Sequence, residues 1–252
     1  MVYTMFCKGY QAFMDGHLEE TIQIARRMIT LGNEVGLPEF VLTCVGNLVL
    51  RPRTYLGDAS RVLERYAQPQ VDMFNISTTA ATIVYSLAHL SRADEVTEIL
   101  ERLVVARTTM GTPEDETGMS LDTICIEAAT LIEHRQAVEL LLKRLAGSSR
   151  YTTGLYNATC VGRHLGAAAA FLGRAEEARK YYADALEVAA DMRFRPELAL
   201  TRLQLAELLL EHYPNEKSDA LEHLDFAINE FREMKMQPSL ERALRHKEIL
   251  GA

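Results

Sequence analysis

The sequence predicts an all-α protein: an α-solenoid in which about six antiparallel helix pairs form a right-handed superhelix that ends in a C-terminal capping helix. Three observations support this fold class. Apolar residues recur at helical spacing through most of the 252 residues, as they do from Leu198 to Phe231. Gly and Pro fall between these helical stretches rather than inside them. The turns that they form recur at a nearly constant interval.

A short turn joins the two helices of each expected pair. Successive turns are 34 to 43 residues apart, and helix pairs with a period in this range are typical of a solenoid. We therefore expect one superhelical domain over residues 1–252. The six turns lie near Gly16, Gly57, Ser91, His134, Gly173 and Asn215.

A second landmark indicates where new pairs begin. The heptapeptides MRFRPEL (192–198) and MKMQPSL (234–240) align position for position, and GLPEF (36–40) is a looser copy. Proline has a fixed φ and no N–H, so it suits the first turn of a helix. Each copy therefore predicts the start of a helix, and the last copy predicts a capping helix over 238–250.

One stretch indicates how the two helices of a pair pack. Residues 165–189 combine small residues, a glycine turn and an alanine-rich amphipathic run. Only Gly or Ala lets two crossing backbones approach closely, and a large neighbour then fills the adjoining groove. The stretch resembles a tetratricopeptide repeat (TPR), and the resemblance is clearest over 155–235. The positions that carry it are Leu165-Gly166 in the first helix, Gly173 in the turn, and Ala178, Tyr182 and Ala185 in the second helix.

The period of about 40 residues resembles that of the superhelical sensor regions of bacterial multidomain regulators, among them the LuxR-type and other STAND regulators. These families use such repeats to receive a ligand or partner and to gate an attached output domain. The resemblance implies a signal-sensing module that is part of a larger bacterial regulator. The sequence contains no GxxxxGK[ST] nucleotide-binding loop, so we expect no nucleotide cofactor.

Charge and cysteine content narrow the range of partners and compartments. The net charge is −8, which disfavours nucleic acid because phosphate binding needs clustered positive charge. The four cysteines form no CxxC pair and lie in apolar stretches, which favours a reducing cytoplasm. The longest uncharged stretch, 73–91, holds too many polar residues for a membrane span. We expect a cytoplasmic protein that binds neither nucleic acid nor a membrane.

The sequence predicts no catalytic residue, metal or cofactor. A di-iron site would need Glu three residues before His on one helix, and none of the seven histidines has this neighbour. Cys160 and His164 stand four residues apart, but two ligands do not make a metal site. We interpret the polar segment 108–118 as a connector between helix pairs, with a functional insertion as the alternative.

The candidate binding residues belong to the first helices of the pairs, which line the concave side of a solenoid. Aromatic rings supply contact area there, while amides and Arg orient polar groups such as carboxylates. In peptide-binding members of the TPR family, Asn and basic residues clamp a C-terminal carboxylate, and Asn157 and Arg163 resemble part of that clamp. The candidate ligand or partner contacts are Asn157, Arg163, His164, Asn47, Tyr85, Tyr3, Phe6 and Tyr10.

The sequence thus predicts a non-catalytic protein-interaction or signal-sensing module that binds a peptide, a partner protein or a small effector in its concave groove. The apolar, aromatic N-terminal end also predicts a homodimer or a covering segment there. Packing in the core or a stacking interface is the alternative for Tyr3, Phe6 and Tyr10. Two other functions stay open: an all-helical enzyme with its site in the concave cavity, and a purely structural self-assembly element.

Overall fold

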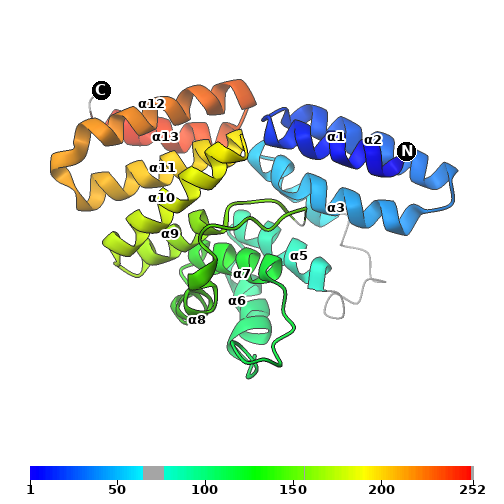
Figure 1. The fold of residues 1–252 in the computed structure, drawn as a ribbon, viewed down its shortest axis with the longest axis horizontal. Coiled ribbons are helices and arrows are strands. Elements are labelled where there is room, and N and C mark those ends of the chain that lie inside the picture. Colours follow the sequence, from blue (N-terminus) through cyan, green and yellow to red (C-terminus); the bar gives the residue numbers. More distant parts are fainter. Residues whose placement is uncertain (65–76, 156, 251–252) are drawn as a thin grey trace. The chain divides into compact units, whose positions relative to one another are not determined.

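The structure is a computed structural model that describes residues 1–64, 77–155 and 157–250. This part of the chain is all-helical, with thirteen α-helices and closely packed neighbours, and its only β structure is an isolated bridge between Thr152 and Cys160. The prediction of an all-α fold is confirmed (Figure 1). The helices follow one another as the pairs α1–α2, α3–α4, α5–α6, α7–α8, α9–α10 and α11–α12, with α13 last.

The contacts within the chain form two compact units. Unit 1 comprises Met1–Asp58, Gly154–Thr159 and Leu186–Ala252, and unit 2 comprises Ala59–Thr153 and Cys160–Ala185. Helix α10 (Ala175–Asp191) contributes its first residues to unit 2 and its last to unit 1. The single superhelical domain therefore stays a prediction.

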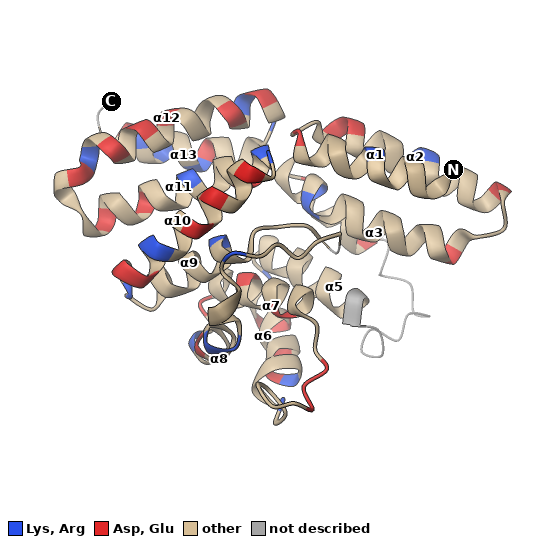
Figure 2. Cartoon of the chain, in the orientation of Figure 1, with Lys and Arg blue, Asp and Glu red and all other residues tan. Residues whose placement is uncertain are grey.

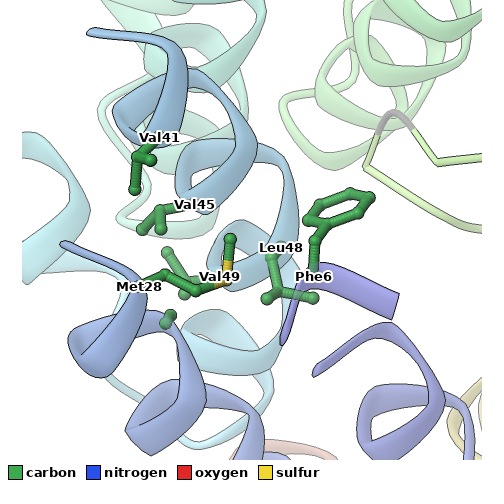
Figure 3. Close-up of a cluster of buried hydrophobic side chains, with 7 residues drawn as sticks. Phe6, Met28, Val41, Val45, Leu48 and Val49 are labelled. Atoms are coloured by element: carbon green, nitrogen blue, oxygen red, sulfur yellow. The ribbon is translucent and has the colours of Figure 1, made fainter. Parts of the chain in front are cut away.

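Unit 1 brings together helices from both ends of the chain. They are α1 (Val2–Met14), α2 (Leu18–Glu34), α3 (Pro38–Tyr55), α11 (Arg195–His212), α12 (Lys217–Met234) and α13 (Gln237–Ile249). A hydrophobic cluster packs α1 to α3 against one another, with Phe6, Met28, Val41 and Val45 all buried (Figure 3). Helix α2 has Gly32 where Val41 packs, and a Cβ atom there would lie 2.7 Å from Val41 Cγ2. The glycine thus allows α2 and α3 to approach closely.

Unit 2 consists of the middle helix pairs. It contains α4 (Ser60–Glu64), α5 (Ser77–His89), α6 (Ala93–Leu100) with a π turn (Glu101–Val105), α7 (Met119–Leu131), α8 (Arg135–Leu145) with a 3₁₀ turn (Ala146–Ser148), and α9 (Val161–Phe171). Between α9 and α10, the Tyr182 ring occupies the space that a Cβ at Gly166 would need. Ala178 and Ala185 are fully buried. The close helix packing predicted for residues 165–189 is therefore present.

Five of the turns within pairs share one backbone design. A residue with positive φ ends the first helix, and the N–H of the next residue donates to a carbonyl five positions earlier, as His17 does to Ala12 at 2.8 Å. The residues that follow the positive φ are all polar: His17, Asp58, Arg92, His134 and Arg174. The sixth turn is the 3₁₀ segment Pro214–Glu216. All six predicted turn positions are confirmed.

Three turns between pairs use the same backbone design with an apolar residue in place of the polar one. We call these apolar residues the cap residues: Leu37 between α2 and α3, Phe194 between α10 and α11, and Met236 between α12 and α13. Their N–H groups donate to the carbonyls of Gly32, Ala189 and Phe231 at 2.9, 2.8 and 2.9 Å. A proline follows within the first turn of α3, α11 and α13, as predicted. The helix predicted over 238–250 is present as α13, and its capping role stays a prediction.

The two aligned heptapeptides meet at the turn between α1 and α2, within unit 1. From the first copy, the Phe194 ring packs edge-on against Phe13 with 5.2 Å between ring centroids, and the Arg195 guanidinium donates to the Asp15 carbonyl at 3.2 Å. From the second copy, Met234 packs against Gly16, and Lys235 Nζ pairs with Glu19 Oε2 at 2.5 Å. The repeated sequence thus serves a shared structural purpose, which is to hold the N-terminal helices against the C-terminal ones.

Candidate functional site

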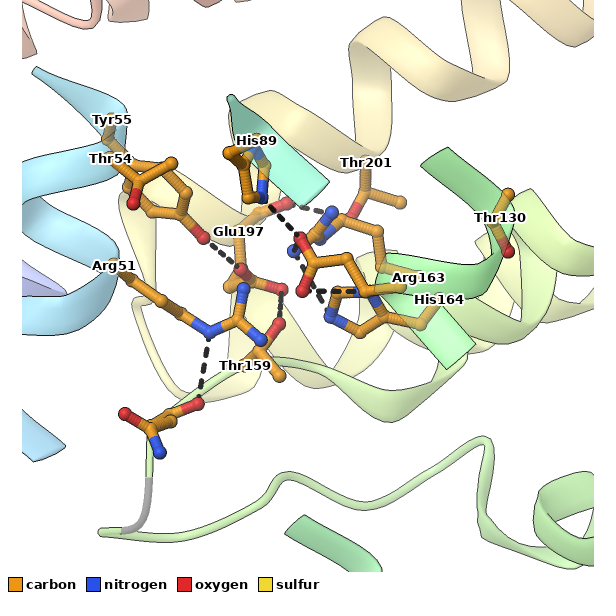
Figure 4. A network of polar contacts seen from close by, with 12 residues as sticks. Arg51, Thr54, Tyr55, His89, Thr130, Thr159, Arg163, His164, Glu197 and Thr201 are labelled. Carbon is orange, nitrogen blue, oxygen red and sulfur yellow. Dashed lines mark hydrogen bonds and ion pairs between the residues drawn. The ribbon is translucent and has the colours of Figure 1, made fainter. Parts of the chain in front are cut away.

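A buried polar cluster lies at the centre of unit 2. The Glu127 carboxylate of α7 stands between His89 of α5 and His164 of α9, with 3.6 Å from His89 Nε2 to Oε1 and 3.6 Å from His164 Nδ1 to Oε2. Arg163 Nη2 lies 4.0 Å from Glu127 Oε1 and 3.2 Å from His164 Nε2 (Figure 4). Helices α5, α7 and α9 are the first helices of three successive pairs, so residues of first helices meet in this cluster.

The Glu127 cluster provides charge compensation for a buried carboxylate. A buried carboxylate needs a nearby cation, and Arg163 supplies one. Both of these histidine–carboxylate distances are longer than an ordinary hydrogen bond. His89 stacks on Tyr85 with 4.4 Å between ring centroids. Its side chain is 24% exposed, against 9% or less for the other three, so the cluster reaches solvent through His89.

Unit 1 contains a second buried polar cluster, built from α3, α11 and residues 157–159. Glu197 is fully buried and accepts hydrogen bonds from the Tyr55 hydroxyl at 3.0 Å and from Thr159 Oγ1 at 2.7 Å. Arg51 is also buried, and its Nε donates to the Asn157 carbonyl at 3.0 Å (Figure 4). Such a network fixes Asn157 and Thr159 against α3 and α11, because each buried polar group would be costly to leave unpaired.

A third cluster, of charged side chains, includes Asp115 of the polar segment 108–118. Asp115 lies 3.2 Å from Arg144 Nε, and Arg107 Nη2 lies 2.8 Å from the buried Asp122. Burial opposes ionisation of Asp115, but hydrogen bonds from Thr117 and Gly111 outweigh it and lower the pKa of Asp115 to about 2. Burial raises the pKa of Asp122, against the opposing effect of Arg107. The segment is thus fastened to the surrounding helices by charge, which favours the connector interpretation.

The eight predicted contact residues fall into both units, and six of them are buried. Tyr85, Arg163 and His164 belong to the Glu127 cluster of unit 2. In unit 1, Asn157 contributes its backbone carbonyl to the Arg51 contact, and Asn47 donates its amide to the Thr43 carbonyl at 3.2 Å. Phe6 lies in the hydrophobic core, as the alternative interpretation of the aromatics expects. The buried six are Asn47, Asn157, Tyr85, Arg163, His164 and Phe6.

The remaining two predicted contacts, Tyr10 and Tyr3, reach the surface to different extents. Tyr10 is half-buried and donates its hydroxyl to the Gly154 carbonyl at 3.0 Å. Tyr3 is 68% exposed. Sequence analysis missed His89, Glu127, Arg51 and Glu197. A signal for Glu127 was available, since it is the single carboxylate in the largely apolar stretch 123–131, whereas Glu197 shares its helix with Glu207 and Glu211.

Large apolar side chains are exposed at the turn between α2 and α3. We call this region the hairpin tip and define it as Val35, Leu37 and Phe40, which are 49%, 53% and 56% exposed. Glu34 and Glu39 are exposed beside them, and acidic residues mark this turn in Figure 2. At the start of α1, Tyr3 is also exposed, while its neighbours Val2 and Met5 pack against the hydrophobic cluster of α1 to α3.

No protein-family model and no curated protein matches the sequence. A function therefore has to be inferred from the residues described above. Within the described residues, no group of three or more His, Cys, Asp or Glu side chains is placed to hold a metal ion. Among the same residues, no helix has both the length and the apolar character needed to cross a membrane.

Proposed function

We propose that this chain is a non-catalytic, TPR-like helical-repeat module whose function is to bind a partner protein or peptide. The exposed hairpin tip is the observation that carries this proposal. Apolar side chains that stay exposed together on a folded domain are typical of an interaction site. Six of the eight residues predicted as groove contacts are instead buried, and four of these six belong to polar clusters inside their own units.

The proposal includes the regulatory role that the long repeat period implies. As part of a larger bacterial regulator, such a module would receive a partner at its surface and pass the change to its neighbours through shared helix interfaces. A small effector is the second candidate ligand, because the Glu127 cluster is accessible from solvent at His89. An effector that carries a carboxylate would compete with Glu127 for Arg163.

The test compares capture of cellular proteins by three forms of the chain. The wild type is immobilised beside Leu37→Glu/Phe40→Glu and beside Ile249→Glu, a control that changes an exposed apolar residue at the opposite end of the sequence. We expect a defined protein to be retained by the wild type and the control and lost by the tip variant, as measured by quantitative mass spectrometry. Equal retention by all three forms, or retention of nothing above an unrelated bait, would overturn the proposal.

One further measurement and one further variant separate the alternatives. Light scattering at two concentrations reports self-association, and a mass that doubles with concentration and is dispersed by the tip substitutions would favour the homodimer. For the effector, His89→Ala is the matched variant, because His89 is the exposed member of the Glu127 cluster. Circular dichroism establishes beforehand that each variant is folded.

A further inference from the structure

The cap residues of unit 1 allow the same local structure to be compared in three surroundings. Leu37, Phe194 and Met236 each follow a residue with positive φ and each close the same hydrogen-bonded turn. In such turns the apolar residue normally packs against neighbouring apolar groups. Phe194 and Met236 are fully buried, whereas Leu37 is 53% exposed. Within the described residues, the turn between α2 and α3 therefore has the backbone of a covered turn but no covering element.

The two covered turns show what kind of element covers such a cap. The turn between α1 and α2 presents the aromatic ring of Phe13 to Phe194. It also presents the acidic side chain of Glu19 to the basic Lys235 beside Met236. The Phe194 contact is accompanied by a hydrogen bond from Arg195 to the uncharged backbone carbonyl of Asp15, and the Lys235–Glu19 ion pair lies beside the buried Met236.

The hairpin tip is negatively charged, whereas the two turns that contain the covered caps are positively charged. Arg193, Arg195 and Lys235 flank the covered caps, while Glu34 and Glu39 flank Leu37. The residues from 28 to 50 contain no Lys, Arg or His. A ligand for the tip therefore needs positive charge next to its apolar side chain, because like charges at short range oppose binding.

We propose that the hairpin tip docks a segment of another protein that carries an aromatic or large aliphatic residue beside Lys or Arg. This inference rests on the proposed function and specifies its partner. A second copy of the chain fits less well, for two reasons. A symmetric contact through the tip would bring the carboxylates of Glu34 and Glu39 against themselves. The chain's own covering element, the turn between α1 and α2, is acidic and already holds the C-terminal helices.

The experiment measures binding of two labelled peptides by fluorescence anisotropy. One is an amphipathic helical peptide of about 16 residues built from Leu, Phe and Lys, and the other has every Lys replaced by Glu. We expect the Lys peptide to bind the wild type, and Leu37→Ala/Phe40→Ala to weaken that binding by about tenfold or more. Both substituted side chains are more than half exposed, so the variant keeps the fold.

A charge variant tests the second part of the proposal. Glu34→Gln/Glu39→Gln should weaken binding of the Lys peptide at low salt, and the loss should shrink as salt rises, because salt screens exposed charges. The matched control is Glu98→Gln/Glu211→Gln, which removes the same charge from exposed positions outside the tip. Equal effects of the two charge variants, or equal binding of the Lys and Glu peptides, would overturn the predicted partner chemistry.

Other results would assign the tip to a different occupant and so overturn this inference. Self-association that Leu37→Glu/Phe40→Glu abolishes would assign it to a second copy. Binding to phosphatidylglycerol vesicles that the same variant abolishes would assign it to a lipid surface. If a cellular protein depends on the tip and the Lys peptide does not bind, the proposed function stands and the partner chemistry fails. If neither binds, both fail.

Discussion

The turns that begin α3 and α13 have the same backbone geometry and opposite surroundings. Gly36 and Lys235 both adopt positive φ, and the next N–H in each closes a turn of the same size at 2.9 Å. The cap residue that follows is fully buried at Met236 and more than half exposed at Leu37. Local sequence thus determines the shape of the turn, while a distant segment determines whether its apolar residue contributes to stability.

The largest effect should come from removing a covered cap. Phe194→Ala should lower the free energy of unfolding by about 3–5 kcal/mol, because it deletes a buried ring and leaves a cavity beside Phe13. Leu37→Ala should change it by no more than about 0.5 kcal/mol, since little of that side chain is buried. Urea unfolding of both variants measures the difference. Similar losses for the two would show that Leu37 is covered after all.

A smaller contrast should appear at two glycines with positive φ. Gly16→Ala should cost about 2–4 kcal/mol, because the new methyl is strained in the left-handed region and also meets Met234 Sδ at 2.5 Å. Gly36→Ala should cost only the strain, about 1–2 kcal/mol, since no atom of the described residues other than its chain neighbours lies within 4 Å of its Cβ position. Thermal unfolding of both variants provides the test. A larger loss at Gly36 than at Gly16 would contradict the contrast.

A third difference should depend on pH. Glu207 of α11 pairs with Arg242 and His246 of α13, and these contacts outweigh burial and lower its pKa below the ordinary value of 4.5. A lowered pKa in the folded state stabilises above the unfolded pKa, and the contribution is lost as pH falls through the folded value. Helix α13 should therefore lose hydrogen-exchange protection on acidification below pH 4.5 before α2 and α3 do.

The control for that experiment is Glu207→Gln, which removes the titrating group. In this variant, protection of α13 should be lower at neutral pH and should change less between neutral and acidic pH. If α13 and the α2–α3 pair lose protection together in the wild type, the ion pairs of Glu207 do not hold the capping helix.

Sequence patterns predicted local structure well and burial poorly. Gly16, Gly57 and Gly173 identified turns because few other residues adopt positive φ without strain, and Pro196 and Pro238 identified helix starts. Arg163 and His164 were predicted as groove contacts from their positions in a first helix, and both do lie in a first helix, α9. Their partner Glu127 lies more than thirty positions away in the sequence, and no local pattern indicates which carboxylate will be brought to a buried Arg. Leu37 illustrates the same limit, since its sequence resembles that of a covered cap.

The smallest effect should come from the ion pair beside the Met236 cap. Lys235 and Glu19 are 65% and 57% exposed, so solvent and salt screen their attraction, and a double-mutant cycle should give a coupling of about 0.5 kcal/mol or less. Lys235→Gly is the informative companion, since it relieves positive φ while removing the charge, and it should be stabilising by up to about 1 kcal/mol. A coupling several times larger would mean that charge, rather than the buried Met236, holds the covered turn in place. In that case the two glutamates at the hairpin tip, and not Leu37, would determine how tightly a partner binds.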